Sequence, residues 1–379
     1  MPPLPSIYCM EQKSIFEAIR ENGRFLIHLP YESFDSVLKL MQEAAEDPNV
    51  LAIKQTLYRV SGNSPVVQAL IRAAKNGKQV TVLFEIKARF DEEHNIRYAR
   101  DLAEAGAHVV YGIAGLKVHC KALLIIRREE DGIHRYAHLA TGNYNDKTAK
   151  QYTDLGFFTE DKILTGDVAG LFNVITGFSD PPSWNKLIVA PFNLREKLIY
   201  LIDREAELSS EKNPGHIRIK CNAIIDYEVI EHLYRAAERF VKIDLIVRGI
   251  CGLNPFSLPP KVAKQFTIVS ILDRFLEHSR IYYFQNNGLP EYYVGSADIM
   301  PRNLNRRIEI LFPVDRMNLR EELNMILESV LNDKRKGRRM IGFNRYSKCN
   351  NHKNNTAALE QHRSQSSLYQ YYRKRFEKE

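Results

Sequence analysis

The chain has 379 residues, of which 44% are apolar and 26% are charged, and its formal net charge at pH 7 is +8. These fractions are typical of a folded globular protein, and the length favours two domains over one. No apolar run reaches the roughly 18 residues of a membrane-spanning helix, and Met1-Pro2-Pro3-Leu4-Pro5 does not resemble a secretion signal, so the sequence predicts neither a membrane span nor export.

The basic excess lies at one end of the chain. From residue 331 onward there are 13 Lys and Arg against 4 Asp and Glu, a net charge of +9, which leaves −1 for the first 330 residues. A polyanion bound by the body of the protein must therefore be held by a local cluster of cations. We interpret the end of the chain as a solvated extension with a last helix over residues 367–376. The alternative is that Arg338 and Arg339 help to cover a polyanion.

The five cysteines are scattered and show no CxxC spacing, which predicts neither a disulfide framework nor a zinc site and fits the reducing cytoplasm. Cys120 follows His119 directly and could be taken for a nucleophile beside its base. Adjacent residues of a strand point to opposite faces, so we expect the sulfur of Cys120 in the core, away from the imidazole.

The first half of the chain alternates between two hydrophobic periods. In chain order, we predict a strand over 25–29, a helix over 31–46, a strand over 50–58, a helix over 65–75, a strand over 79–85, a helix over 92–104 and a strand over 108–113. Strands separated by single helices predict parallel pairing in an α/β sheet. Two further strand-like runs, 117–127 and 136–140, are expected to form a hairpin that carries His119.

The second half repeats this order after a Pro- and Ser-rich break at residues 178–183. We predict helices over 193–208 and 226–239, strands over 217–221 and 242–248, and a hairpin that joins 282–284 to 291–294. The predicted domains are residues 1–180, 181–332 and the extension 333–379.

Each half contains a histidine two residues before a cation in a β-like run, followed about twenty residues later by a turn of small residues. Residues two apart in a strand share a face, so each pair aims an imidazole and a positive charge at one point, as a phosphate requires. The two segments are His119-Cys120-Lys121 with Thr141-Gly142-Asn143, and His278-Ser279-Arg280 with Gly295-Ser296-Ala297-Asp298.

The chain contains no GxxxxGK[ST] loop and neither the HRD nor the DFG element of protein kinases. If it transfers phosphoryl groups, the nucleophile is therefore expected to be His119. A neutral imidazole can attack a γ-phosphorus in line, and the phosphoramidate that results remains reactive. Such a nucleophile needs an acceptor on its second ring nitrogen and cations around the transferred oxygens, for which Lys121 is suitably placed.

Several segments together resemble the bacterial polyphosphate kinases of the type-1 family, over about residues 8–375 and in that family's order. They are residues 56–60, 88–96, 115–121, 141–149, 152–154, 247–249 and 273–280, read as TLYRV, ARFDEEHNI, GLKVHCK, TGNYNDKTA, YTD, VRG and DRFLEHSR. The resemblance implies an α/β fold of two tandem phospholipase-D-like domains, each a mixed sheet flanked by helices. It also implies reversible transfer of the terminal phosphate of ATP to inorganic polyphosphate.

The resemblance implies site residues as well. His119 matches the phosphorylated histidine, whereas Tyr152, Arg248 and His278 match nucleotide-contacting or transfer-assisting positions. Two arginines match a site that is linked to magnesium in the family; because arginine cannot ligate Mg²⁺, we expect them to grip the phosphate oxygens that the metal also bridges, or else to form surface ion pairs. These two are Arg59 and Arg89.

Four further roles follow by chemistry. Asp154 is the candidate acceptor for the free nitrogen of His119, with an N-cap or surface carboxylate as the alternative. Asn143 could present its amide to phosphate or simply favour the turn. His278 could protonate the leaving ADP oxygen or contact the transferred phosphate, and Arg280 would mirror Lys121.

Two departures qualify the resemblance. Phospholipase-D enzymes place an aspartate five residues after the lysine, but here those positions hold Ile126 and Gln285, which weakens a phosphodiesterase interpretation. The family's full-length proteins also carry an N-terminal and a helical middle region without counterpart here. Part of the adenine pocket would lie there, so transfer by this chain alone is in question.

We therefore predict a cytoplasmic, homo-oligomeric polyphosphate kinase that uses Mg²⁺, binds ATP or ADP and inorganic polyphosphate, and recognises no specific nucleic acid. Peripheral association with the inner face of the membrane is left open by the basic extension. The alternatives are a phosphodiesterase of the phospholipase-D type and a non-catalytic polyanion-binding module. The catalytic prediction requires the imidazoles of His119 and His278 to reach one phosphate.

Overall fold

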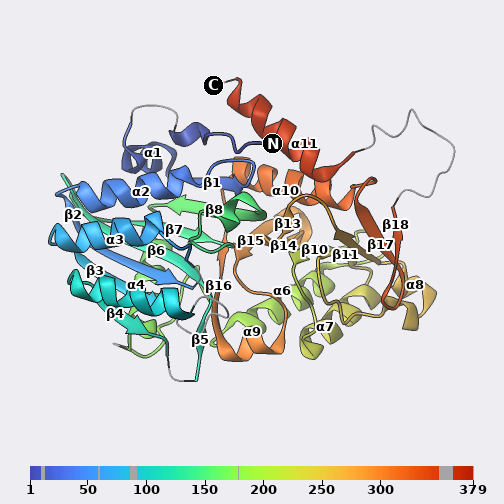
Figure 1. The fold of residues 1–379 in the computed structure, drawn as a ribbon. Coiled ribbons are helices and arrows are strands. Elements are labelled where there is room, and N and C mark those ends of the chain that lie inside the picture. Colours follow the sequence, from blue (N-terminus) through green and yellow to red (C-terminus); the bar gives the residue numbers. More distant parts are fainter. Residues whose placement is uncertain are drawn as a thin grey trace. The chain divides into compact units, whose positions relative to one another are not determined.

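The computed structural model describes residues 1–9, 13–58, 60–85, 92–113, 115–177, 179–349 and 362–378. The chain forms two compact units, which Figure 1 shows as ribbons. Unit 1 consists of Met1–Leu187, Arg306–Glu309 and Lys374–Glu379, and unit 2 consists of Ile188–Asn305 and Ile310–Arg373. The domain limits expected from the sequence, after residues 180 and 332, stay a prediction.

Unit 1 contains a mixed sheet with strands β1 (Arg24–Leu29), β2 (Val50–Leu57), β3 (Gln79–Phe84), β4 (His108–Tyr111), β6 (Lys121–Glu129), β7 (Gly132–Ala140) and β8 (Tyr152–Thr159). Their order is β1-β8-β7-β6-β2-β3-β4. The neighbours β2, β3 and β4 pair in parallel, as expected for strands joined by single helices. The hairpin of β6 and β7 is antiparallel, as are the pairs of β2 with β6, β7 with β8 and β1 with β8.

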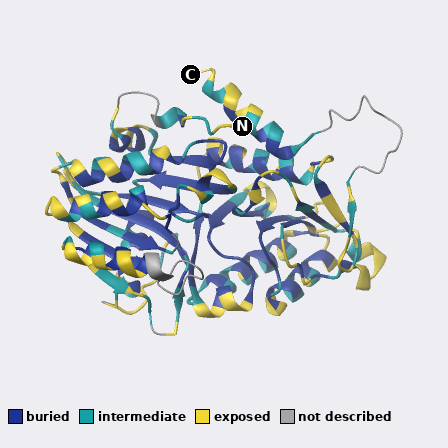
Figure 2. Ribbon diagram, in the orientation of Figure 1, coloured by how far each residue is buried: buried dark blue, intermediate teal, exposed yellow. Residues whose placement is uncertain are grey.

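The helices of unit 1 are α1 (Ile15–Asn22), α2 (Asp35–Glu46), α3 (Pro65–Lys75), α4 (Glu92–Glu104) and α5 (Lys162–Ile175). Ser64 caps α3 by accepting from the N–H of Val67, and Pro65 occupies the first turn, where its missing N–H costs nothing. Apolar residues of α1 to α4 share one buried cluster with β1, β2, β3 and β6, and Figure 2 shows the buried side of these helices turned toward the sheet. Helix α5 contacts β6 and β7.

Unit 2 contains a second mixed sheet. Its strands are β9 (Ile188–Ala190), β10 (His216–Cys221), β11 (Lys242–Val247), β12 (Phe266–Ile271), β14 (Arg280–Phe284), β15 (Glu291–Gly295), β16 (Arg307–Pro313), β17 (Gly337–Gly342) and β18 (Arg345–Lys348). The short strand β13 (Leu276–Glu277) is not part of this sheet. The order is β18-β17-β12-β11-β10-β14-β15-β16, with β10, β11 and β12 parallel. The predicted hairpin of residues 282–284 and 291–294 is confirmed as the antiparallel pair of β14 and β15.

The helices of unit 2 are α6 (Leu194–Leu208), α7 (Tyr227–Glu238), α8 (Pro260–Ala263), α9 (Pro301–Arg306), α10 (Met317–Leu331) and α11 (Ser364–Phe376). Apolar residues of α6 and α7 pack in one cluster with β10, β11 and β14, and α10 also contacts β11. Two mixed sheets flanked by helices agree with the predicted α/β class. Within the described residues, no helix combines the length and the apolar character that crossing a bilayer needs.

The end of the chain corrects one interpretation. A solvated extension was expected from residue 333, but β17 pairs antiparallel with β12 and β18 pairs antiparallel with β17. Met340 of β17 is 5% exposed and belongs to the core cluster of unit 2. The expected last helix is present as α11, which begins at Ser364.

Candidate functional site

His119 is held by a segment far away in the sequence. It lies between β5 (Lys117–Val118) and β6, and β5 pairs in parallel with the start of β16. The backbone N–H groups of His119 and Cys120 both donate to the carbonyl of Ile308, at 3.0 and 2.9 Å. The first residues of β16 belong to unit 1, so this contact lies inside one compact unit. The position of the imidazole therefore depends on a pairing between residues some 190 positions apart.

The Nδ1 atom of the His119 ring is hydrogen-bonded to the carboxylate of Glu309. Nδ1 lies 2.9 Å from Oε1 and 3.0 Å from Oε2 of this carboxylate. The Glu309 side chain is fully buried, whereas 13% of the His119 side chain is exposed. A carboxylate that accepts from Nδ1–H fixes the tautomer in which Nε2 carries the lone pair. The ring is thus oriented as a nucleophile needs.

This contact corrects the expectation for Asp154. The sequence suggested Asp154 as the acceptor, but the carboxylate found at Nδ1 is that of Glu309. Asp154 is 4% exposed, and its Oδ1 accepts from the hydroxyl of Thr141 at 2.6 Å. It is therefore a buried carboxylate that ties β8 to the turn after β7. One signal in the sequence pointed to Glu309, because an acid between Ile308 and Ile310 in a strand-like run is unusual unless it is paired.

The His119 ring and the Lys121 ammonium group both lie near the ring of Tyr58, a residue that the sequence analysis did not identify. The Tyr58 and His119 rings lie edge to face with centroids 5.0 Å apart. The ammonium group of Lys121 lies 5.6 Å from the Tyr58 centroid and donates to the carbonyl of His119, and that of Lys117 lies 5.3 Å from the same ring. Lys121 is 2% exposed, so its charge is largely desolvated and acts strongly at short range.

Cys120 lies in the core, as predicted. The residue is 2% exposed, and burial raises the pKa of its thiol to about 12. The sulfur therefore stays protonated at neutral pH, and a thiolate nucleophile beside His119 is not formed.

The turn of Thr141, Gly142 and Asn143 packs directly on Asp154. Together with Asp154 and His138, Gly142 and Asn143 line a small cavity of about 10 Å³. Within the described residues, the side-chain oxygen of Asn143 is buried without a hydrogen-bond partner. The suggested presentation of the Asn143 amide to a phosphate stays a prediction.

A methyl group at residue 142 should disturb this turn. A Cβ atom there would overlap the Asp154 carboxylate, which Thr141 holds in place. We expect Gly142→Ala to lower the free energy of unfolding by about 1–3 kcal/mol because the site is already full. Gly166→Ala is the matched control, since a Cβ at that position of α5 meets nothing within 4 Å. Urea unfolding of both variants measures the difference, and equal stabilities would contradict the proposed crowding.

In unit 2, Arg280 links His278 to a buried acid. His278 lies between β13 and β14. The Nη1 atom of Arg280 donates to the carbonyl of His278 at 2.7 Å and lies 3.3 Å from both of its ring nitrogens. The same guanidinium donates to Asp298 from Nε at 3.2 Å and from Nη2 at 3.1 Å. Asn222 completes the group, with its N–H on Asp298 at 2.8 Å and its amide on the His278 carbonyl at 3.3 Å.

The acid in this group is strongly perturbed. Burial acts to raise the pKa of Asp298, but the charge and hydrogen bonds of Arg280 outweigh it and hold the pKa at about 2. Asp298 stood in the small-residue turn noted in the sequence, although no role was given to it. The expected similarity of Arg280 to Lys121 at a phosphate stays a prediction, because the structure shows the guanidinium bound to Asp298.

Removal of Arg280 should destabilise the protein in a pH-dependent way. Arg280→Ala leaves a buried carboxylate without its cation, so we expect a loss of about 3–5 kcal/mol at pH 7. A depressed pKa contributes stability above the ordinary value of 3.8 that is lost as the pH falls through about 2. The difference between variant and parent should therefore shrink toward pH 2 in urea titrations. Arg302→Ala, at an exposed position of α9, is the control.

The double variant decides the cause of this loss. Asp298→Asn in the Arg280→Ala background removes the unpaired charge and should recover part of the lost stability. No recovery would mean that lost packing, rather than the buried carboxylate, sets the effect.

Tyr152 and Arg248 lie at strand ends. Tyr152 begins β8 and shares a strand face with Asp154. Arg248 follows β11, and its carbonyl accepts from Ser270 of β12 at 3.4 Å. Arg59 and Arg89 lie outside the described residues.

Magnesium finds no protein cage in the part of the chain that the structure describes. No group of three or more His, Cys, Asp or Glu side chains lies close enough together there to hold a metal ion. Mg²⁺ commonly binds through substrate phosphates with only one or two carboxylates. The described residues therefore do not by themselves fit a resident metal, and the expected Mg²⁺ stays a prediction.

Two family models together match most of the chain. The family model of polyphosphate kinase C-terminal domain 1 matches residues 14–181, and that of C-terminal domain 2 matches residues 187–365. Polyphosphate kinase 1 of Chlorobaculum tepidum is 51% identical over 334 residues, which are 88% of this chain and 47% of that protein. Polyphosphate kinase of Halalkalibacterium halodurans is 49% identical over 91% of this chain and 48% of its own length. The chain thus spans about half the length of these relatives.

A solved structure of a polyphosphate kinase has the same fold as this chain. The crystal structure of polyphosphate kinase from Porphyromonas gingivalis has a TM-score of 0.90 and 37% identity, and covers 100% of this chain and 57% of that one. Phosphatidylserine synthase of Haemophilus influenzae matches with a TM-score of 0.56 at 10% identity over 94% of each chain, which concerns the fold alone. The predicted α/β class, with two mixed sheets flanked by helices, is confirmed, and the likeness to phospholipase-D domains stays a prediction. The chain belongs to the polyphosphate kinase family and carries its C-terminal domains 1 and 2.

Proposed function

We propose that this chain performs the phosphoryl-transfer chemistry of a polyphosphate kinase, with His119 as the phosphorylated residue. The terminal phosphate of ATP would pass to His119 and then to the end of an inorganic polyphosphate chain, and both steps would be reversible. The observation that supports this most directly is the buried carboxylate of Glu309 on Nδ1 of His119, in a member of the polyphosphate kinase family.

The proposed first step forms one bond and breaks one. Nε2 of the neutral imidazole attacks the γ-phosphorus, the N–P bond forms, and the bond from phosphorus to the ADP oxygen breaks. The ring becomes positively charged as the N–P bond forms, and the Glu309 carboxylate stabilises that charge through Nδ1–H. In the second step, a terminal polyphosphate oxygen attacks the same phosphorus and the imidazole leaves as a neutral ring.

The other residues are proposed to bind and orient phosphate. Lys121, with its charge desolvated beside Tyr58, would attract the transferred oxygens. His278 is proposed to protonate the leaving ADP oxygen or to contact the transferred group, with Arg280 beside it. Tyr152, Arg248 and Asn143 are proposed nucleotide contacts. That both histidines serve one phosphate remains part of the proposal.

Arg59 and Arg89 are proposed to grip the phosphate oxygens of the nucleotide, where Mg²⁺ would supply further positive charge if it is bound. We expect Arg59→Ala and Arg89→Ala each to lower phosphorylation of the protein by γ-labelled ATP more than Arg338→Ala does. Each variant removes one guanidinium, so the comparison separates a local role from net charge. Equal losses in all three variants would contradict a local phosphate site.

Activity measurements test the function as a whole. With ATP and a polyphosphate primer, labelled γ-phosphate should enter the polymer, and with ADP and labelled polymer it should return to ATP. Release of headgroup from phospholipid would favour a diesterase, and binding of polymer without transfer would favour a binding module. Cytoplasmic location, homo-oligomerisation and peripheral membrane association stay predictions.

A further inference from the structure

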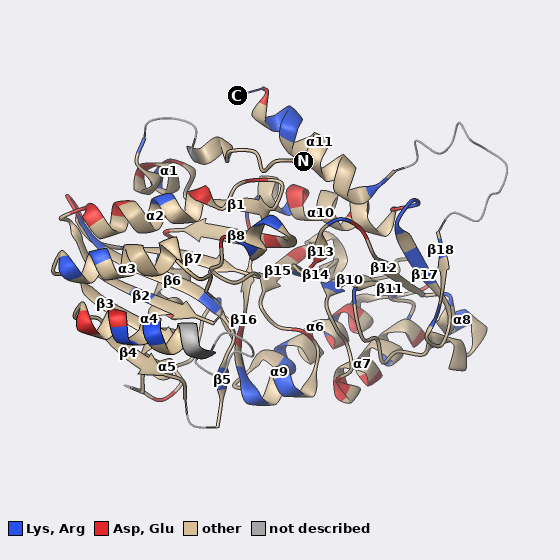
Figure 3. Ribbon diagram, in the orientation of Figure 1, with Lys and Arg blue, Asp and Glu red and all other residues tan. Residues whose placement is uncertain are grey.

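The basic excess of the protein is concentrated in the edge hairpin of unit 2. Residues 333–349 contain seven Lys and Arg and a single acid, Asp333, and Figure 3 shows blue segments on β17 and β18. Among the residues that the structure describes, six of these cations form no ion pair. They are Lys334, Lys336, Arg338, Arg339, Arg345 and Lys348.

Both carboxylate oxygens of Asp333, the single acid of this segment, accept hydrogen bonds from neighbouring residues. Oδ1 of Asp333 accepts from the backbone N–H groups of Arg335, Lys336 and Gly337, at 2.9, 2.6 and 3.1 Å. Oδ2 accepts from the backbone N–H and the hydroxyl of Ser364, both at 2.7 Å. Asp333 is 0% exposed. Its carboxylate therefore shapes the loop and does not form an ion pair with any of the six cations named above.

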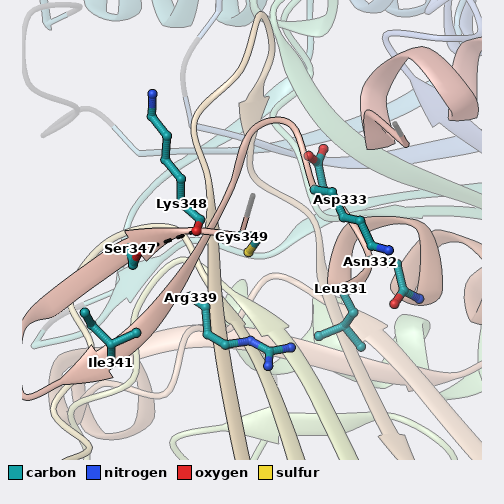
Figure 4. Close-up of a pocket in the computed structure, with 9 residues that line it drawn as sticks. Leu331, Asn332, Asp333, Arg339, Ile341, Ser347, Lys348 and Cys349 are labelled. Atoms are coloured by element: carbon teal, nitrogen blue, oxygen red, sulfur yellow. Dashed lines mark hydrogen bonds between the residues drawn. The ribbon is translucent and has the colours of Figure 1, made fainter. Parts of the chain in front are cut away.

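A cavity of about 270 Å³ lies beside the hairpin. Figure 4 shows the Arg339 side chain extending from β17 toward Leu331 at the end of α10. The volume approaches the lower end of ordinary ligand pockets. Cations and neutral donors dominate its polar lining, which suits an anion of small cross-section. The lining residues are Leu331, Asn332, Asp333, Lys334, Arg339, Ile341, Ser347, Lys348 and Cys349.

The register of the hairpin spreads cations over both of its faces. Arg338 pairs with Lys348, and Arg339 pairs with Ser347. Because the side chains of neighbouring residues in a strand point to opposite faces, those of Arg338 and Arg339 lie on different sides of the sheet. A flat bilayer could meet only one of these faces, whereas a thin, flexible polyanion can contact both.

The hairpin also lies near a proposed nucleotide contact within the same unit. Arg338 pairs with Ser270 of β12, and the hydroxyl of Ser270 donates to the carbonyl of Arg248, which follows β11. Two strand spacings separate β17 from β11, roughly 10 Å. A polyanion held at the hairpin could therefore extend to the strand end that carries Arg248.

From these observations we propose that the β17–β18 hairpin, with residues 333–336, is a second binding site for the inorganic polyphosphate chain. It holds the polymer away from the reacting end. The identity of the polymer rests on the proposed function, whereas the cationic site rests on the hairpin alone. Linear polyphosphate carries a negative charge on each unit, is thin, and has no apolar surface, which fits a cation-lined cavity and a two-faced hairpin.

Matched charge variants of the full chain test this proposal. Arg339→Gln with Lys348→Gln removes two charges from the hairpin, and Lys261→Gln with Lys264→Gln removes two exposed charges near α8 in the same unit. Binding of fluorescent long-chain polyphosphate is measured without ATP over a series of salt concentrations. We expect the hairpin pair to bind roughly tenfold more weakly with a shallower salt dependence, and the α8 pair to bind like the parent. Phosphorylation by γ-labelled ATP should be unchanged in both.

Each outcome has a distinct meaning. Equal weakening in both pairs, or none in the hairpin pair, overturns the proposed site. Loss of binding to phosphatidylserine vesicles with polyphosphate binding intact overturns it in favour of a membrane contact. A selective loss of polymer binding in a protein that takes up no label supports the site and counts against the proposed catalysis. Arg339→Lys, which keeps the charge, should retain most of the binding and so excludes a folding defect as the cause.

Discussion

Substitution of His119 by alanine should abolish the covalent phosphorylation of this protein by γ-labelled ATP. The parent protein is expected to acquire a label that acid removes and base does not, as a phosphoramidate requires. His119→Ala removes Nε2, the nucleophile that Glu309 orients through Nδ1, so no N–P bond can form. The measurement is the labelled fraction after separation of protein from nucleotide, followed by treatment with acid and with base.

His216→Ala provides a matched control for this variant. His216 also pairs with a buried carboxylate, since its Nε2 lies 2.7 Å from Asp244, and its side chain is 18% exposed compared with 13% for His119. It carries no proposed role in transfer. The control should therefore be labelled like the parent. Retention of label in His119→Ala, or its equal loss in both variants, would refute the phosphohistidine assignment.

Replacement of Glu309 by glutamine should slow labelling by about 10²–10⁴-fold while leaving His119 in place. The amide is nearly isosteric and can still contact Nδ1, but it carries no charge to stabilise the ring as the N–P bond forms. A glutamine can also present its NH₂ group to Nδ1, which favours the tautomer with the proton on Nε2 and blocks attack. Rapid mixing with labelled ATP gives the rate of the first step.

The corresponding change at the control pair is Asp244→Asn. It removes the buried carboxylate from His216 and should leave the labelling rate at the level of the parent. Thermal unfolding of both variants shows whether a slower rate reflects chemistry or loss of folded protein. A Glu309→Gln protein that is folded and labelled at the rate of the parent would show that the carboxylate has no part in the transfer.

Local patterns in the sequence were sufficient for many elements. The helices predicted over 65–75 and 92–104 agree in their limits with α3 and α4, because apolar period, capping residues and terminal Asn-Gly or Gly signals act within a few residues. The parallel pairing of β2 with β3 and of β10 with β11 also followed from the alternation of strands and helices. The core position of Cys120 followed from its place next to His119.

The sequence did not indicate that residues 333–349 form a hairpin at the edge of the second sheet. Their charge suggested solvation, yet a strand at a sheet edge can expose its cations on either face while its backbone groups pair with a neighbour. The partner of β17 is β12, more than sixty residues earlier in the chain. The pairing, and with it the cavity and the cations of the hairpin, therefore depended on a contact between distant segments.

The sequence by itself determined the α/β class, most strand and helix positions, and the two histidines with their nearby cations, because these depend on periodicity and spacing between neighbours. Only the tertiary structure decided which carboxylates contact His119 and Arg280. Glu309 reaches His119 because β16 pairs with β5, and Asp298 reaches Arg280 because β15 pairs with β14. A hydrogen bond depends on distance in space, and residues that are far apart in the chain carry no local pattern that specifies it.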